Sequence, residues 1–244
     1  MRRFFTEPQN IAGNTAYIFE DARHIEKALR MSVGDELIVF DGSGFEYTAR
    51  LTEISKNRCA AEITEKRESL SEPKIKVTLF QALPKAGKME TVIQKAVELG
   101  VYEIVPVITE RCVTKIANAA AAAEKAARWN KVSVEAAKQC GRGYLPEVTA
   151  VMNADEAFRL AAESGTALFF YEHETRGLRD TLENRGVSDT VSLVIGPEGG
   201  FAPEEVQKAR DAGLVSVSLG TRILRCETAP VAALAAVLYA GGNM

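Results

Sequence analysis

The sequence has few cysteines and histidines, and none of them is spaced as a metal site. Its four cysteines, Cys59, Cys112, Cys140 and Cys226, form no C-x-x-C pair, and it holds only two histidines. This pattern argues against both a zinc site and a disulfide framework. We therefore expect buried thiols, no metal, and a reducing cytoplasm as the location.

Long hydrophobic runs are also missing. No apolar stretch approaches the roughly 20 residues that a membrane span needs. The first residues, Met1–Pro8, lack the apolar segment of a secretion signal. We expect no membrane partner. With 244 residues, of which 46% are hydrophobic and 26% charged, the chain suits one large or two small globular domains.

The phosphate-binding signatures of nucleotide enzymes are absent as well. No G-x-G-x-x-G follows an expected strand, and Gly87-Lys88 continues with Met89 instead of the Ser or Thr of a P-loop. A phosphate-cradling loop is therefore not expected.

Charge is distributed unevenly, although the net charge is only −3. Residues 73–150 hold 12 Lys and Arg against 7 Asp and Glu, whereas acidic residues outnumber basic ones on both sides. An anionic partner would meet the middle of the chain. Lysines that merely solvate helices would give the same excess.

The first seventy residues have the pattern of short strands. Leu37–Phe40 is followed by the turn Asp41–Gly44, after which apolar and polar residues alternate from Phe45 to Thr52. This alternation across a glycine turn predicts a hairpin with one buried face. We expect a small β-barrel over residues 1–72, ending in the charged segment Glu65–Pro73.

From Ile75 onward, strand and helix patterns alternate. Apolar runs at 75–83, 101–108, 167–171, 191–195 and 215–219 predict strands, and helical spacing marks 89–97, 118–140, 203–213 and 229–239. This order predicts an α/β domain over residues 73–244, with a mostly parallel sheet covered by helices.

Two glycine-containing turns end apolar strands in the last third of the chain. The first is Gly196-Pro197-Glu198-Gly199-Gly200, and the second is Leu219-Gly220 leading into Ile223–Ala229. Glycine lets backbone groups approach a ligand and tolerates positive φ. At the carboxyl ends of parallel strands, such turns predict a ligand cleft. They would also serve simply as tight turns.

Five sequence blocks in one order give the chain a resemblance to a known family. They are His24–Asp35 with Phe40–Gly42, Lys85–Val101, Glu135–Arg142, Ile195–Phe201 and Ile223–Ala229. The second half resembles a SPOUT-class methyltransferase. The full length resembles the RsmE family, which methylates N3 of a uridine in bacterial 16S ribosomal RNA. Cys226 departs from the pattern, because threonine is expected at this position.

The resemblance implies a fold that no periodicity would predict. It consists of an N-terminal PUA-like β-barrel that binds RNA and a C-terminal SPOUT domain whose chain forms a deep trefoil knot. It also implies a homodimer with the site at the subunit interface, S-adenosylmethionine as the methyl donor, and 16S ribosomal RNA, within the 30S subunit, as the partner.

The resemblance also places site residues on this chain. It implies cofactor binding by Tyr171, Glu172, Ile195, Gly196, Pro197, Glu198, Gly199, Gly200, Leu219, Gly220, Ile223, Leu224, Arg225, Glu227, Thr228 and Ala229. It implies RNA binding by Arg2, Arg3, Arg30, Lys85, Lys88, Lys95, Gln139 and Arg142. The catalytic candidates are Arg142, Glu198 and Arg225.

Each charged candidate also has a structural interpretation. Glu198 is either a carboxylate that caps a helix N-terminus, or one that lies near the sulfonium or holds its loop shut. Arg225 and Glu227 would otherwise form a surface or interface ion pair. Arg142 and Gln139 would otherwise be solvated at the end of a helix.

Uridine N3 carries a proton, so its methylation needs a proton acceptor or cations that favour the anion. The residues leave the base open among Glu172, Glu198 and Glu227. Two other functions remain possible at this stage. One is a SPOUT methyltransferase acting on a ribose 2′-hydroxyl or on transfer RNA, and the other is a non-catalytic RNA-binding module.

Overall fold

The computed structural model of this chain describes residues 1–85 and 87–244. Ala86, which belongs to the Lys85–Glu90 motif, lies outside the described residues. The chain divides into two compact units. The first comprises Met1–Glu72 and Ala137–Leu145, and the second comprises Pro73–Ala136 and Pro146–Met244. The sequence-based domains, residues 1–72 and 73–244, stay a prediction; the compact units place residues 137–145 with the first part of the chain.

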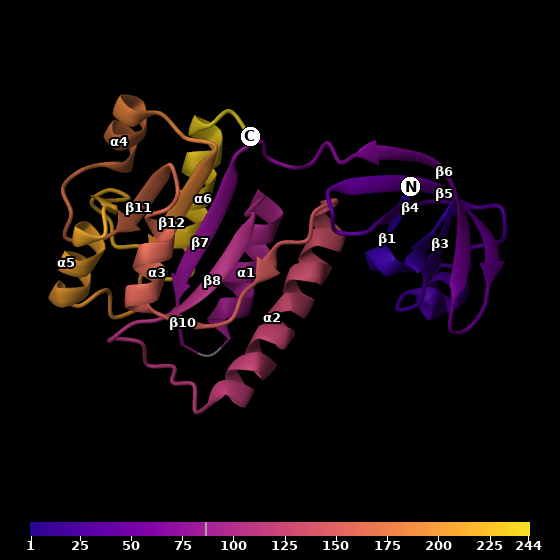
Figure 1. The fold of residues 1–244 in the computed structure, drawn as a ribbon, viewed down its shortest axis with the longest axis horizontal. Coiled ribbons are helices and arrows are strands. Elements are labelled where there is room, and N and C mark those ends of the chain that lie inside the picture. The colour runs from indigo at the N-terminus through magenta and orange to yellow at the C-terminus, as the bar shows by residue number, and fades with distance from the viewer. Residues whose placement is uncertain (86) are drawn as a thin grey trace. The chain divides into compact units, whose positions relative to one another are not determined.

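The first unit, drawn in indigo and purple in Figure 1, contains a six-stranded sheet. The strand order is β1, β4, β5, β6, β3, β2. The strands are β1 (Arg2–Phe5), β2 (Ile11–Ala12), β3 (Thr15–Ile18), β4 (Glu36–Phe40), β5 (Phe45–Ile54) and β6 (Cys59–Glu68). Only β1 and β4 pair in parallel; the other described pairs are antiparallel. This unit also contains two short helices, the 3₁₀ helix η1 (Pro8–Asn10) and the π-helix η2 (His24–Ala28).

The expected hairpin is formed by β4 and β5. Leu37 faces Ala49 across the pair, and the alternating Tyr47, Ala49 and Leu51 are buried in the core of the first unit. The period of two therefore correctly identifies the buried face. One polar neighbour, Glu46, is buried as well, at 6% exposed, because cationic and hydroxyl groups surround its carboxylate.

Residues 137–145 are held to the first unit by the carboxylate of Glu72. Its Oε2 accepts hydrogen bonds from Nε and Nη2 of Arg142 at 3.1 and 2.6 Å. Its Oε1 accepts the backbone N–H groups of Gly143 and Tyr144 at 3.0 and 3.1 Å. One side chain thus ties a distant part of the chain to this unit, and no periodicity in the sequence would have predicted the contact.

The second unit is built on a parallel sheet in the order β10, β8, β7, β12, β11, β13, with β9 paired to β8. The strands are β7 (Lys76–Ala82), β8 (Glu103–Ile108), β9 (Glu147–Val148), β10 (Met152–Asn153), β11 (Thr166–Phe170), β12 (Thr190–Ile195) and β13 (Val215–Val217). Every described pairing in this sheet is parallel, which confirms the α/β prediction.

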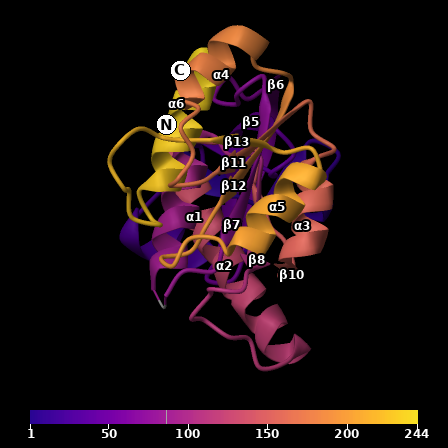
Figure 2. The ribbon, with the colours of Figure 1, turned by 90° about the vertical axis from the view of Figure 1, so that its left-hand side faces the viewer.

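Helices cover both faces of this sheet. Figure 2 shows α1 and α6 on one side and α3 and α5 on the other. The helices are α1 (Lys88–Leu99), α2 (Ala119–Cys140), α3 (Ala154–Ala161), α4 (Leu178–Arg185), α5 (Pro203–Asp211) and α6 (Ala229–Ala240). Helices α3 and α4 and the short strands β9 and β10 were not predicted. The last four residues of α2 belong to the first unit.

Helix α1 follows its sequence pattern closely. Gly100, in the left-handed region at φ 105°, ends the helix, and its N–H donates to Val97 O and Ala96 O. A side chain at this position would collide with Pro73, so the glycine is required for packing as well as for its backbone conformation. The apolar positions buried against the sheet are Met89, Val92, Ile93, Ala96 and Val97.

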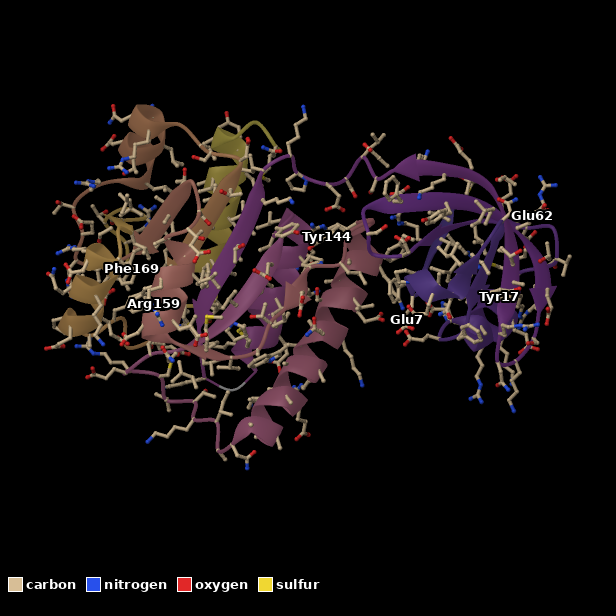
Figure 3. All side chains as sticks on the ribbon, in the orientation of Figure 1. Glu7, Tyr17, Glu62, Tyr144, Arg159 and Phe169 are labelled. Carbon is tan, nitrogen blue, oxygen red and sulfur yellow. The ribbon has the colours of Figure 1, made fainter. Side chains whose placement is uncertain are left out.

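An aromatic cluster fills the core under α3 and α5. Phe169 of β11 (labelled in Figure 3) lies 4.3 Å from Phe201 and 5.6 Å from Phe158 between ring centroids. All three rings are 2% exposed or less. Because Phe201 directly follows the first glycine turn, the core of the sheet fixes one end of that turn.

No helix among the described residues is long and apolar enough to cross a membrane. Within the same residues, no group of three His, Cys, Asp or Glu side chains is arranged to hold a metal ion.

Candidate functional site

A large cleft opens in the second unit where β11, β12 and β13 end. Its volume is about 930 Å³. Three loops line it, over residues 170–177, 195–200 and 218–229, and Lys88 from the start of α1 completes the wall. Because the strands are parallel, their carboxyl ends meet at one edge of the sheet, which is where open α/β sheets bind ligands.

The first glycine turn has little room for side chains. A Cβ on Gly196 would lie 3.0 Å from the Phe201 ring, and a Cβ on Gly200, which has φ 66°, would collide with the Glu172 carboxylate. A Cβ on Gly199 would lie 3.2 Å from Cβ of Arg111. The absence of side chains therefore keeps this loop tight and leaves its backbone at the cleft.

In the second turn, glycine is required because of its backbone conformation, and not because neighbouring atoms leave no space for a side chain. Gly220 has φ 106°, and a Cβ there would meet nothing within 4 Å. A side chain would fit the space but strain the backbone. The hydroxyl of Ser218 accepts the N–H of Gly220 and donates to its carbonyl, both at 3.1 Å, and so reinforces the turn.

Lys88 joins two acidic side chains at the edge of the cleft. Its Nζ lies 3.1 Å from Oε1 of Glu198 and 3.0 Å from Oε2 of Glu227. The Cys226 thiol donates to the same Oε2 at 3.2 Å, and its sulfur lies 3.8 Å from Nζ. The Glu198 carboxylate also accepts the backbone N–H of Lys85 at 3.1 Å. Of the interpretations proposed for Glu198, the one in which it holds its loop in place agrees with these contacts.

These contacts set the ionisation of the group. Hydrogen bonds from Cys226 and Lys88 lower the pKa of Glu227 to about 2. Burial alone would raise the pKa of Glu198, but donors including its own N–H, that of Lys85 and the Lys88 ammonium lower it overall. Both carboxylates are therefore ionised at neutral pH, and as weakened bases they are poorly suited to take a proton from a substrate.

The pKa values of the Cys226 thiol and the Lys88 ammonium are raised, whereas those of the two carboxylates are lowered. Burial, together with hydrogen bonds to Glu227 and Glu198, raises the pKa of Cys226 to about 12. Hydrogen bonds to Glu227 and Glu198 also raise the pKa of Lys88 above its usual 10.5. At neutral pH the cluster holds two carboxylates, one ammonium and one neutral thiol, and the Cys226 thiol donates a hydrogen bond as a threonine hydroxyl would.

Most residues predicted to bind the cofactor line this cleft. Two predicted residues, Glu227 and Thr228, lie in the third loop but not in the lining. Glu227 has Lys88 as its ion-pair partner, where a pair with Arg225 was the structural alternative. Those in the lining are Tyr171, Glu172, Ile195, Gly196, Pro197, Glu198, Gly199, Gly200, Leu219, Gly220, Ile223, Leu224, Arg225 and Ala229.

Several lining residues were missed, although a signal for them exists. They directly continue the loops already chosen, so reading each loop to its full length would have included them. These residues are Phe170, His173, Glu174, Thr175, Gly177, Ser218, Thr221, Arg222 and Cys226. Lys88, which was predicted to contact RNA, also lies in the cleft lining.

Arg142 was predicted as a catalytic and RNA-binding residue, with a solvated side chain as the alternative. The residue is only 3% exposed, and its guanidinium is bound by Glu72, so the solvated alternative is wrong. A side chain held in this way anchors residues 137–145. Its catalytic and RNA-binding roles stay predictions.

Arg3, whose RNA contact stays a prediction, is also held by contacts within the first unit. Its Nη1 lies 3.0 Å from Glu46, its Nη2 donates to the carbonyl of Arg142, and its guanidinium carbon lies 5.3 Å from the centre of the Phe40 ring. The basic–aromatic combination at this end of the chain is thus part of the first unit's interior. Pairing with β4 holds β1 as a strand.

The other predicted RNA contacts remain at the surface. Arg2 is exposed and donates to the carbonyl of Leu29, and Arg30 is exposed at φ 49°. Lys95 pairs with Glu98 on α1, with a distance of 2.8 Å. Lys85 and Gln139 are exposed.

Comparison with known proteins agrees with this geometry. A family model described as an RNA methyltransferase domain matches residues 71–238, and an RNA methyltransferase PUA domain matches residues 20–64. Ribosomal RNA small subunit methyltransferase E of Bacillus subtilis is 32% identical, over 98% of this chain and 96% of its own. The chain belongs to this methyltransferase E family.

Other family members extend the likeness. The protein of the same description from Synechocystis sp. is 32% identical, over 96% of this chain and 76% of its own. A crystal structure of the methyltransferase E of Neisseria gonorrhoeae, bound to S-adenosyl methionine, is 36% identical. It superposes with a TM-score of 0.87 and covers 98% of this chain and 97% of that one. The expected α/β fold with an RNA methyltransferase PUA domain is therefore confirmed.

Proposed function

We propose that this chain transfers a methyl group from S-adenosylmethionine to N3 of a uridine in 16S ribosomal RNA. The observation that carries the proposal is the cleft formed by the three loops after β11, β12 and β13. Membership in the methyltransferase E family gives the reaction class, and the expected N3 target comes from the family resemblance of the sequence.

The residues present fit this donor. The cleft volume, about 930 Å³, lies within the range of sites for ligands of this size. Its wall combines apolar side chains, among them Ile195, Leu219 and Leu224, with the backbone of two glycine turns. Such a wall suits adenine, which is flat and neutral, and the acidic side chains suit the positive sulfonium. When bound, the donor supplies an already activated methyl group.

The chain's own residues then have to position the uridine and help remove its N3 proton. Holding the reacting atoms in line accounts for roughly 7–11 kcal/mol of the barrier. Arg225, exposed at the cleft, is placed to stabilise negative charge on the base oxygens.

Among the three carboxylates considered as the proton acceptor, Glu172 is now the best candidate. Glu198 and Glu227 are both occupied by Lys88 and have lowered pKa values. Glu172 is exposed at the end of β11 and lines the cleft. General-base help of this kind contributes about 10²–10⁴-fold. The Glu172→Gln variant should therefore lower kcat while it leaves binding of the donor intact.

We further propose that the chain works as a homodimer. Helix α6 is apolar on all sides, and the face formed by Val231, Ala232, Ala235 and Ala236 is only partly covered. An apolar helix normally has all its faces buried, so a second copy would cover this one. The helix directly follows the third loop of the cleft, which would bring the site next to the interface.

The finer parts of the fold prediction belong to this proposal as well. We propose a trefoil knot in the second unit, supported by the convergence of three loops on one cleft. In single-molecule stretching from both ends, a knotted chain would give a contour length shorter than its 244 residues allow. An unknotted length would refute it.

We assign RNA binding to the first unit and catalysis to the second, with the cytoplasm as the location. The exposed Arg2, Arg30, Lys85 and Gln139 remain the proposed RNA contacts. Lys95 remains one as well, although it is paired with Glu98.

The decisive experiment is a labelled-methyl assay on 30S subunits from cells that lack this modification. Methylation at N3 blocks Watson–Crick pairing, so reverse transcriptase should stop one nucleotide before the modified uridine. Label on transfer RNA alone, or on a ribose 2′-oxygen, would favour another SPOUT methyltransferase. Absence of donor binding in calorimetry would favour a non-catalytic RNA-binding module.

A further inference from the structure

Lys88 occupies an unusual place for a lysine that the sequence assigns to RNA. It is the first residue of α1 and lines the cleft, and its side chain is only 31% exposed. Its ammonium lies within 3.1 Å of two carboxylates, whereas Lys95 of the same helix pairs with a neighbour on its own surface. An ammonium engaged in this way has little capacity left for a phosphate.

The two carboxylates come from different loops of the cleft. Glu198 lies in the glycine turn after β12, and Glu227 lies in the segment that leads into α6. Lys88 belongs to neither, so its ammonium links both loops to the start of α1, a helix that packs against α6. The backbone N–H of Lys85 also donates to the Glu198 carboxylate, so two groups near the start of α1 hold the glycine turn.

We propose that Lys88 is a positioning residue that holds these two loops at the spacing required to bind the methyl donor. The role rests on the proposed function of the cleft. Loops held in their binding conformation before the ligand arrives lose less freedom on binding, which increases affinity. Cys226 assists as a neutral donor to the same Glu227 oxygen that Lys88 contacts.

The test compares Lys88→Met with Lys88→Arg, which keeps the charge, and with a matched control, Lys208→Met. Lys208 also makes an ion pair in the second unit, with Asp155 at 2.8 Å, but it lies on α5 outside the cleft lining. Calorimetry with S-adenosylmethionine should show about tenfold weaker binding for Lys88→Met. Lys88→Arg should recover most of the affinity, and Lys208→Met should match the wild type.

Kinetics separate this role from a contact with RNA. Lys88→Met should raise KM for the donor and leave both KM for RNA and its salt dependence unchanged. A residue that contacts a phosphate would instead raise KM for RNA and reduce the salt slope by about 1. That second outcome, with donor affinity unchanged, would overturn the proposal.

A double-mutant cycle tests the link itself. If Lys88 acts through Glu227, then Glu227→Gln should weaken donor binding in the wild type but have little further effect in Lys88→Met. Purely additive losses would contradict the coupling.

Hydrogen exchange of the ligand-free protein gives a readout that does not depend on activity. Lys88→Met should speed amide exchange in residues 197–200 and 223–228, while Lys208→Met should not. Unchanged exchange would overturn the link. Failure of the wild type to bind S-adenosylmethionine would instead overturn the proposed function, and with it the role of Lys88 in binding.

Discussion

At the scale of single residues, Cys226 and Glu227 are neighbours whose pKa values move in opposite directions. Burial raises the pKa of the thiol first, and one hydrogen bond contributes to both shifts. The thiol donates a hydrogen bond to the carboxylate, which stabilises the protonated sulfur and the ionised oxygen together. The position where threonine was expected is therefore occupied by a group that performs the same donation. The substitution changes the atom and keeps the hydrogen bond.

This pairing predicts a thiol of low reactivity. With a pKa of about 12, roughly one Cys226 in 10⁴ is a thiolate at pH 8, and the residue is only 5% exposed. Iodoacetamide at pH 8 should label Cys226 at least a hundred times more slowly in the folded protein than in urea. Peptide mass spectrometry measures both rates, and equal rates would contradict the prediction.

The Cys226→Thr variant should preserve donor binding, whereas Cys226→Val should weaken it.

Glu227 predicts a pH dependence of stability. Its pKa falls from 4.5 to about 2 on folding, so its stabilising effect is complete above pH 4.5 and is lost as the pH falls from 4.5 toward 2. Urea midpoints of the wild type and of Glu227→Gln should therefore differ most at pH 6 and converge as the pH is lowered to 3.5. A difference that stays constant over this range would show that the ionised carboxylate is not responsible.

The pair of Glu72 and Arg142 predicts a large loss of stability. Glu72→Gln would leave the Arg142 guanidinium buried without its carboxylate, at a cost of about 3–5 kcal/mol to the first unit. Urea unfolding measures this loss. The control is Glu36→Gln, because the pair of Glu36 with Arg50 is about half exposed and should contribute less than about 1 kcal/mol. Equal losses in the two variants would refute the anchoring role.

At the scale of elements, the glycine turn after β12 depends on the aromatic core beneath it. In Gly196→Ala the new Cβ would press on the Phe201 ring, which is already packed 4.3 Å from Phe169. We expect a loss of about 1–3 kcal/mol and weaker donor binding. Gly186→Ala, in open space at φ 73°, would carry the backbone strain alone and should leave donor binding unchanged. Calorimetry on both variants separates the two effects.

Elements with a strong local pattern could be predicted from the sequence, and weaker ones could not. The strands around the cleft are apolar, and β12 and β13 end in glycine turns, so their positions and the presence of a cleft followed from the residues. The individual lining residues were predicted from the family resemblance. Helix α3 carried a usable signal, because Asn153 caps it and Ala154, Ala157, Phe158 and Ala161 recur at helical spacing. Helix α4 offers only Leu178, Thr181 and Leu182 as buried residues and had no clear pattern.

Contacts between distant residues were beyond such reasoning. The guanidinium of Arg142 is paired with Glu72, and the ammonium of Lys88 is paired with Glu198 and Glu227. Within its own sequence motif, each of these two basic residues is typical of an RNA contact. Only the fold supplies the carboxylates that occupy it.

At the scale of the whole molecule, the partly covered face of α6 predicts a dimer. A charge at its centre, as in Ala235→Glu, would have to be buried between two copies and should give monomers. Light scattering after gel filtration measures the mass. The control Ala123→Glu, at an exposed position on α2, should keep the wild-type mass. A wild-type mass near 26.5 kDa would contradict the dimer directly.

The position of β12 in its sheet constrains how the protein is made. This strand lies between β7 and β11, both of which precede it in the chain, and Thr190 pairs with Lys76. During synthesis, β7 and β11 leave the ribosome first, and neither can pair with β12 until that strand has emerged. Such distant pairing slows folding. The cleft at the ends of these strands can therefore form only after β12 has been synthesised.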